Sequence, residues 1–162
     1  MKRYIAILAL IVLALSQKTI ACDCDSTGDF LAIAARAEMV ALVKVTNYLN
    51  IKNRYGRETA AEMEIIEVYR GTETRKTITF WGSTGKDCRP LVSQLEVGKY
   101  YVIAFNKCYA DGVETTNDYT TSICGIHWLV VDINSQHARG EVGENKKEIQ
   151  LTVLKEKLKQ NK

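Results

Sequence analysis

The sequence predicts a mainly β fold, a small closed or partly closed barrel with one helix before it and one after it. Most of the chain shows short runs of alternating apolar and polar residues separated by turn residues, a pattern typical of strands. Residues 29–37 and 144–159 instead place apolar side chains at helical spacing. Five or six strands with short turns favour a barrel, although strand count alone does not distinguish it from a β sandwich.

The boundaries of these elements follow from the spacing of apolar residues. Ile33 and Ala34 share one helical face with Phe30, whereas Val43 and Val45 alternate with polar neighbours. The predicted elements are a helix at residues 29–37, strands at residues 39–49, 58–69, 76–81, 100–105, 120–124 and 127–133, and an amphipathic helix at residues 144–159. In the last helix, Leu151, Leu154 and Leu158 lie on one face.

The first 21 residues have the composition of an export signal. Two basic residues precede an apolar run at residues 4–15, and Thr19 and Ala21 occupy the small-residue positions before a cleavage site. The run is shorter than the roughly 20 apolar residues that a membrane-spanning helix needs. We therefore expect a signal peptide at residues 1–21 and a secreted mature chain, residues 22–162, that forms a single domain.

A second cleavage pattern leads to a different prediction for the same cysteine. Thr19-Ile20-Ala21-Cys22 loosely matches a bacterial lipoprotein signal, in which the cysteine is acylated, although leucine is usual where Thr19 stands. An acylated Cys22 would anchor the chain in a bacterial envelope, and a membrane is expected as a partner only in that case. The sequence alone leaves both alternatives open.

The charge balance excludes one class of partner. Three of the 22 basic residues, Lys2, Arg3 and Lys18, lie in the predicted signal, which has no acidic residue, so the remaining 19 match the 19 acidic residues of the mature chain. A protein that binds nucleic acid normally carries a basic excess. We therefore expect no nucleic-acid partner.

Five cysteines in an exported chain predict an oxidising compartment and structural disulfides. The closely spaced Cys22 and Cys24 would also suit metal binding or disulfide exchange, but the chain has only two histidines and no second close pair of cysteines. Structural disulfides are therefore the better explanation. The number is odd, and lipidation of Cys22 would leave an even set of four cysteines with three possible pairings.

Several features, taken in order, resemble the tissue inhibitors of metalloproteinases (TIMPs) and their netrin-like relatives. They are Cys22-x-Cys24, the Val-Ala-Leu-Val-Lys-Val run at residues 40–45, Glu67-Val68-Tyr69-Arg70-Gly71, Cys88 after a glycine-bearing loop, and Thr120-Thr121-Ser122-Ile123-Cys124. The resemblance covers residues 22–133. It implies a five-stranded OB-type barrel whose N-terminus is held by two disulfides, Cys22 with Cys88 and Cys24 with Cys124.

The resemblance also implies a function. In that family the mature N-terminal cysteine chelates the catalytic zinc of a metalloendopeptidase through its free amine and carbonyl oxygen, at the position that a catalytic zinc keeps open for water. Cys22 would have this role here, and Asp23 would enter the specificity pocket of the protease. The rim of the contact would be formed by Gly85, Lys86, Asp87 and Arg89. No cofactor and no metal of its own are implied.

Two residues depart from the family pattern. The family usually has a small hydroxyl or apolar side chain where this chain has Asp23, and a carboxylate in an apolar pocket costs several kcal/mol unless it is paired or protonated. Asp23 therefore predicts either a target with a basic pocket or loss of inhibition. Cys108 is unpaired if both family disulfides form, and a buried, reduced cysteine would account for it.

Other patterns have simpler structural explanations. Cys124 and His127 could be a nucleophile and a base, but both lie in predicted strands and exported cysteines are usually bonded. The Gly-Ser-Thr-Gly-Lys run at residues 82–86 fits neither a nucleophile elbow nor a phosphate loop, so we interpret it as a turn. With no acid, base and nucleophile set, we do not expect an enzyme. The main alternative is a cell-envelope lipoprotein or extracellular binding module that recognises protein or glycan.

Two surface hypotheses compete with ordinary packing. Aromatic side chains could stack ligands as they do on other OB barrels, but in a neutral chain with strand periodicity we expect them to pack in or beside the core. These aromatic residues are Trp81, Tyr100, Tyr101, Phe105 and Trp128. The lysines of the helix predicted at residues 144–159 could lie on an anionic membrane, but we expect its leucines to pack on the barrel and its lysines to be solvated.

Overall fold

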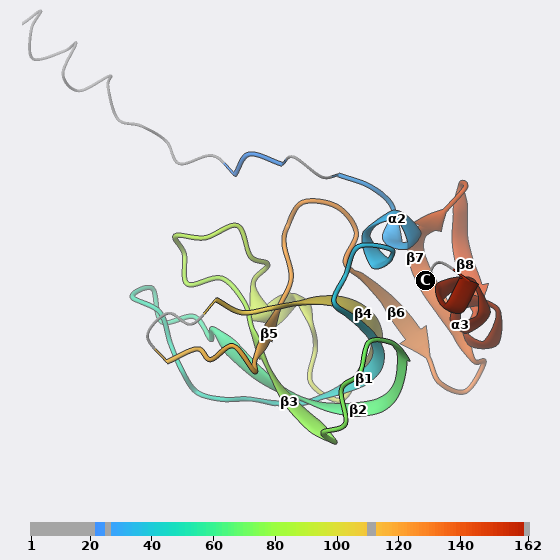
Figure 1. Cartoon of the computed structure of the whole chain (residues 1–162). Helices are drawn as coiled ribbons and strands as arrows, with labels where there is room; N and C mark the ends of the chain where they lie inside the picture. The colour runs from blue at the N-terminus through green and yellow to red at the C-terminus, as the bar shows by residue number, and fades with distance from the viewer. Residues whose placement is uncertain (1–21, 25–26, 110–112, 161–162) are drawn as a thin grey trace, which may run out of the picture.

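The computed structural model describes residues 22–24, 27–109 and 113–160 (Figure 1). The signal predicted at residues 1–21 lies outside the described residues. Within them, no helix is long and apolar enough to cross a membrane. In chain order the elements are α2 (Phe30–Ala34), β1 (Met39–Tyr48), β2 (Ala60–Arg70), β3 (Thr77–Trp81), the 3-10 turn η1 (Val92–Gln94), β4 (Tyr100–Lys107), β5 (Tyr119–Thr120), β6 (Trp128–Asp132), β7 (His137–Gly143), β8 (Lys146–Gln150) and α3 (Leu151–Gln160).

Five strands close into a barrel. β1 pairs antiparallel with β2, and β2 pairs antiparallel with β3; β3 is parallel to β5, and β4 pairs antiparallel with both β5 and β1. The order β1-β2-β3-β5-β4 therefore returns to its start, as the predicted five-stranded OB-type barrel requires. The prediction of a mainly β barrel is confirmed, and the sandwich alternative is excluded. Three register shifts between β1 and β2 give the bending that closure needs.

The sheet continues beyond the barrel through β6, β7 and β8. β4 shares one edge between two partners, because Asn106 and Lys107 pair with β5 whereas residues 100–103 pair with β6. The segment 121–127 leaves the sheet between these pairings and carries Cys124. The strand predicted at residues 120–124 is therefore wrong except at Thr120, because this stretch forms a loop rather than a ladder with β4.

Alternate side chains of β1 enter two separate cores. Met39, Ala41 and Val43 point into the barrel, where they join β4 side chains such as Ile103 and Phe105. The intervening side chains of β1 and β4 pack on the outside, in a second cluster under the two helices. Both strands are consequently apolar on both faces, which is why the sequence reads as a nearly continuous apolar run there.

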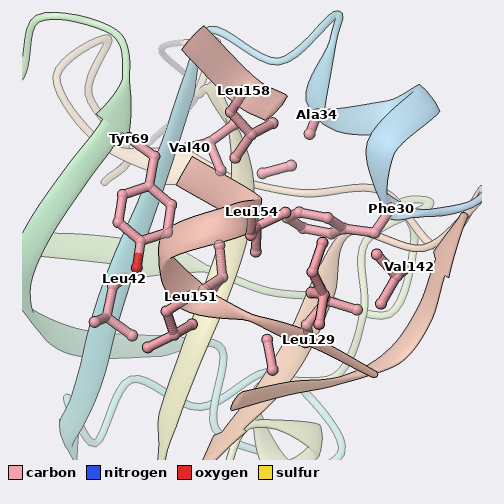
Figure 2. Packing of buried hydrophobic residues seen from close by; sticks show 14 of the residues in the cluster. Phe30, Ala34, Val40, Leu42, Tyr69, Leu129, Val142, Leu151, Leu154 and Leu158 are labelled. Carbon is pink, nitrogen blue, oxygen red and sulfur yellow. The ribbon is translucent and has the colours of Figure 1, made fainter. Parts of the chain in front are cut away.

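The second core lies between the extended sheet and the helices α2 and α3. Figure 2 shows Phe30 of α2 and Leu154 of α3 meeting in this cluster above Leu129. The predicted leucine face of the last helix is confirmed, since Leu151, Leu154 and Leu158 are all buried. Trp81, Tyr101 and Phe105 are buried and Tyr100 and Trp128 are half-buried, so the aromatic residues pack as predicted.

The first helix is shorter than predicted. Asp29 caps it, accepting a hydrogen bond from the backbone N–H of Ala32 at 3.0 Å, and the helix ends at Ala34 rather than at residue 37. The backbone N–H of Glu38 donates to the carbonyl oxygen of Phe105, so the chain has already joined the sheet. Pairing with the sheet therefore ends the helix earlier than the helical spacing of the alanines predicts.

The helix predicted at residues 144–159 is wrong over its first seven residues. Lys146–Gln150 forms β8, which pairs antiparallel with β7, and the helix begins at Leu151. Glu144 and Asn145 have positive φ angles of 51° and 63° between the paired Gly143 and Lys146, the backbone of a two-residue type I′ hairpin. β7 was not predicted at all, because Gly140 and Gly143 interrupt its apolar alternation.

Candidate functional site

Two disulfides hold the first described residues against the barrel. Cys22 is bonded to Cys88, with a Cα–Cα distance of 5.6 Å, and Cys24 is bonded to Cys124, with a Cα–Cα distance of 5.3 Å. Both pairings are those that the TIMP resemblance implied. Figure 1 shows the blue N-terminal segment running past the loops that follow β3 and β5 before it enters α2. The disulfides indicate an oxidising compartment.

Backbone hydrogen bonds add to these covalent connections. The N–H of Ile126 donates to the carbonyl oxygen of Gly28 at 3.0 Å, which fixes the segment behind Cys24. Gly125 makes the approach possible, because its φ is +94° and a Cβ there would lie 2.7 Å from Ile33 Cδ1 and 3.2 Å from the Gly28 oxygen. The loop that carries Cys124 is therefore packed tightly on the N-terminal segment.

The residues at the predicted zinc-binding and specificity positions are accessible. Cys22 is half-buried, whereas Asp23 and Cys24 are exposed. Asp23 thus lies between two disulfide-bonded cysteines, with its backbone restrained on both sides. A short segment presented in this way can bind a partner with little loss of conformational entropy.

The predicted contact rim is a structured loop next to Cys88. Thr84 donates to Asp87 Oδ2 through its hydroxyl at 2.8 Å and its backbone N–H at 3.1 Å, while the N–H of Gly85 donates to the hydroxyl of Ser83. Burial alone would raise the pKa of Asp87, but the hydrogen bonds from Thr84, together with Ser83 and the charge of Arg89, lower that pKa. Gly85 and Lys86 are exposed, and Asp87 is half-buried as an internal brace of the loop.

Arg89 faces inward more than a rim residue would. Its Nη1 lies 2.6 Å from Glu114 Oε1, and only 17% of the Arg89 side chain and 7% of the Glu114 side chain are exposed. Burial alone would lower the pKa of Arg89, but the bond to Glu114 and the negative charges around it together raise that pKa. The pair joins the loop after β3 to the loop after β4, a connection between distant segments that the sequence did not indicate.

Cys108 is the free cysteine of the chain and is buried. It packs in a small cluster with Ala60 and Trp81. Burial raises its pKa to about 12, so the reactive thiolate is scarce at neutral pH. The buried, reduced state considered for Cys108 is therefore found, and the odd number of cysteines is explained without lipidation of Cys22.

The loop between β1 and β2 also contributes to this end of the molecule. A Cβ on Gly85, whose φ is +91°, would lie 3.1 Å from the Tyr55 ring, so the two loops are in close contact. Tyr55 is 59% exposed at the surface. An aromatic residue beside glycine in a polar loop was the available signal, but the contact with Gly85 depends on the tertiary structure.

The other chemical patterns of the sequence have structural roles. Cys124 is bonded to Cys24, so it is no nucleophile, and His127 is buried with its two ring nitrogens 3.3 and 3.2 Å from the carbonyl oxygens of Ala104 and Cys124. Residues 82–86 lie in the loop that follows β3. Among residues 22–24, 27–109 and 113–160, no cluster of three His, Cys, Asp or Glu side chains could hold a metal ion.

Comparison of the chain with protein-family models and with curated proteins finds no match. The structure itself therefore defines the class of protein. It is a five-stranded barrel with two disulfides that hold the exposed Asp23 between two bonded cysteines. This geometry, together with the motifs that resemble the TIMPs, is the basis for a functional proposal.

Proposed function

We propose that the protein is a secreted inhibitor of zinc metalloendopeptidases. In this proposal the signal is cleaved before Cys22, and the free amine and carbonyl oxygen of Cys22 chelate the catalytic zinc of the protease. The observation that carries the proposal is the pair of disulfides from Cys22 and Cys24 to two separate loops of the barrel. A flexible N-terminus would lose much of its chelating power to the entropy of ordering, and this one is restrained in advance.

The chemistry of an N-terminal cysteine suits the task. An α-amine has an ordinary pKa of about 7.7 to 8.0, so its neutral, metal-binding form is accessible near neutral pH. The amine nitrogen and carbonyl oxygen of one residue close a five-membered ring around a metal ion. Binding of both atoms displaces the water that a catalytic zinc uses for hydrolysis. The protease would then be blocked without any reaction of the inhibitor.

The side chain that follows Cys22 sets the expected target. Asp23 is exposed and would project beside the chelated zinc into the specificity pocket of the protease. Desolvation of a carboxylate in an apolar pocket is unfavourable, whereas an arginine or lysine in the pocket would pair with it. We therefore propose a target protease that prefers an acidic side chain at this position, and weak inhibition of proteases with apolar pockets.

The lipoprotein alternative has less support than the inhibitor. Acylation would attach a lipid to the sulfur of Cys22, and in the structure that sulfur is bonded to Cys88. Lipidation of Cys22 would leave an even number of cysteines to pair. This no longer favours lipidation, because Cys108 is buried as a free thiol. A binding module without inhibitory activity remains the outcome to be tested against the proposal.

The test is an inhibition assay with protein whose first residue is Cys22, against a panel of zinc endopeptidases with apolar and with basic specificity pockets. A matched control is the same protein begun one residue earlier, at Ala21, because the added residue converts the amine of Cys22 into an amide. We expect inhibition of a protease with a basic pocket by the first protein and at least a hundredfold weaker inhibition by the second, a difference of about 3 kcal/mol.

A second variant tests the role assigned to the specificity residue. Replacement Asp23→Thr should extend inhibition to proteases with apolar pockets, because it removes the desolvation cost of the carboxylate. If neither the wild type nor the Asp23→Thr variant inhibits any protease in the panel, the proposed activity is refuted. Equal inhibition by the chains that begin at Cys22 and Ala21 would refute the chelation mechanism.

A further inference from the structure

A groove lies beside the candidate site, between the β1–β2 loop and the loops that follow β3 and β4. Its volume is about 520 Å³. Ile51, Trp81 and Val113 supply its apolar lining, and Ile51 and Val113 are 36% and 71% exposed. We call it the loop groove. None of the chemistry proposed for Cys22 uses it.

The rim of the loop groove is basic. Lys52, Arg54 and Lys86 line it together with the apolar residues. Lys52 has a carboxylate partner, Glu58, at 3.7 Å, but within the described part of the chain neither Arg54 nor Lys86 forms an ion pair. The acidic lining residue Glu114 is already paired with Arg89. Among the residues that the structure describes, the groove therefore offers two positive charges without a carboxylate partner beside its apolar lining.

Hydrogen bonds within the protein order two parts of the groove, the tip of the β1–β2 loop and the ring of Trp81. Asn53 Oδ1 accepts hydrogen bonds from the backbone N–H groups of Tyr55 and Arg57, at 2.9 and 3.1 Å, which shapes the tip of the β1–β2 loop. Trp81 Nε1 donates to Asp118 Oδ2 at 3.1 Å, which fixes the ring. Parts of a groove that are already ordered lose little entropy on binding.

We propose that the loop groove binds an extended acidic segment of a partner protein, with an apolar side chain against the exposed Ile51 and Val113 and carboxylates beside Arg54 and Lys86. The charge of the rim selects an anionic ligand. The apolar lining favours a peptide over a sulfated glycan, because a glycan has little apolar surface to bury there. The neutral charge balance of the mature chain gives no support for a nucleic acid.

The probe is an acetylated peptide amide of sequence Glu-Asp-Leu-Leu-Asp-Glu, titrated into the disulfide-bonded protein by calorimetry. We expect saturable binding that weakens as salt increases, and about tenfold weaker binding by the double variant Arg54→Ala with Lys86→Ala. The matched control, Lys146→Ala with Lys147→Ala, removes the same amount of charge from the distant β7–β8 hairpin and should leave the affinity unchanged. Thermal unfolding of both variants checks that each is folded.

Three results would overturn the proposal. They are no binding of the peptide at about 1 mM, equal binding by the groove variant and the hairpin control, or tighter binding of dextran sulfate than of the peptide at the same site, which would identify a general polyanion site. The assay contains no protease and does not depend on the amine of Cys22. A failure here is therefore distinguishable from a failure of the inhibitor proposal, and the protein begun at Ala21 should bind the peptide equally well.

Discussion

The backbone N–H of Ile123 donates a hydrogen bond to the carbonyl oxygen of Cys88 at 2.9 Å. This bond joins the two loops that anchor the N-terminal segment, because Cys88 is bonded to Cys22 and the neighbour of Ile123, Cys124, is bonded to Cys24. The two disulfides thus form one unit rather than two independent crosslinks. What loosens one anchor is expected to loosen the other.

This connection gives a prediction for disulfide removal. The bonds span sequence separations of 66 and 100 residues, for which the chain-entropy model gives nearly equal contributions. With one bond intact, the other closes a circuit on the order of 40 residues through it, and the same model gives about 4 kcal/mol for either. The variants Cys22→Ser with Cys88→Ser and Cys24→Ser with Cys124→Ser should lose similar stability in urea unfolding. A difference of more than about 1 kcal/mol would contradict the chain-entropy account of the two bonds.

Glu73 is expected to be a major stabilising residue at one end of the barrel. Its carboxylate accepts hydrogen bonds from Arg75 Nη2 at 2.6 Å and Tyr119 Oη at 2.9 Å, and its side chain is only 8% exposed. Replacement Glu73→Gln should lower the free energy of unfolding by about 2 kcal/mol, because it removes the charge that these donors face. Glu64→Gln, at an exposed position of β2, should have almost no effect.

The same carboxylate predicts a pH dependence. The hydrogen bond from Arg75 holds the pKa of Glu73 well below its usual range, despite the opposing effect of burial. The unfolded state therefore binds a proton more readily, and the stabilisation is complete above about pH 4.5 and declines as the pH falls toward the lowered pKa. The stability difference between the wild type and Glu73→Gln should narrow below pH 4. A constant difference would show that the charge of Glu73 is not responsible.

His127 predicts a second pH dependence at a higher pH. Burial lowers its pKa below the usual value, and its contacts with the carbonyl oxygens of Ala104 and Cys124 offset this only in part. Stability is therefore complete above the unfolded pKa of about 6.5 and is lost as the pH falls toward the lowered value, by at most about 1.4 kcal/mol per pH unit. His127→Gln should remove this slope in urea titrations between pH 5 and pH 7, whereas His137→Gln should retain it.

Two glycines with similar backbone angles should respond differently to alanine. Gly71 has a φ of +97°, and a Cβ there would lie 2.8 Å from the carbonyl oxygen of Glu38, whereas Gly98 has a φ of +85° and nothing within 4 Å. Both variants incur the cost of a positive φ, about 1 to 2 kcal/mol, but only Gly71→Ala adds a backbone clash. We expect Gly71→Ala to be the more destabilising in thermal unfolding by at least about 1 kcal/mol. Equal losses would exclude the clash.

Local patterns predicted the barrel and β6 but not the β7–β8 hairpin. The apolar runs of β1 and β4 were clear because both faces of these strands are buried, one in each core. The β7–β8 hairpin was missed because its glycines and lysines weaken the alternation, and because Ile149 and Leu151 fit a helical face as well as a strand followed by a helix. Strand pairing with β7 decided the conformation there, and no local signal reports it.

Long-range contacts limited the prediction of the candidate site. The disulfide partners of Cys22 and Cys24 were expected only through the TIMP resemblance, since spacing alone left the pairing open. The ion pair of Arg89 with Glu114 and the packing of Tyr55 on Gly85 join loops distant in sequence. These contacts form only when the barrel brings the loops together at one of its ends. Patterns within a single sequence therefore cannot predict them.

Cobalt spectroscopy can show whether the amine of Cys22 binds the zinc of a target protease, as we propose. Zinc(II), with its filled d shell, has no d–d bands in the visible region, whereas cobalt(II) placed in the same site reports its ligands through such bands. Addition of one equivalent of protein beginning at Cys22 to the cobalt-substituted protease should change these bands, and protein beginning at Ala21 should not. Unchanged bands in a fully inhibited protease would show that inhibition occurs without chelation by Cys22.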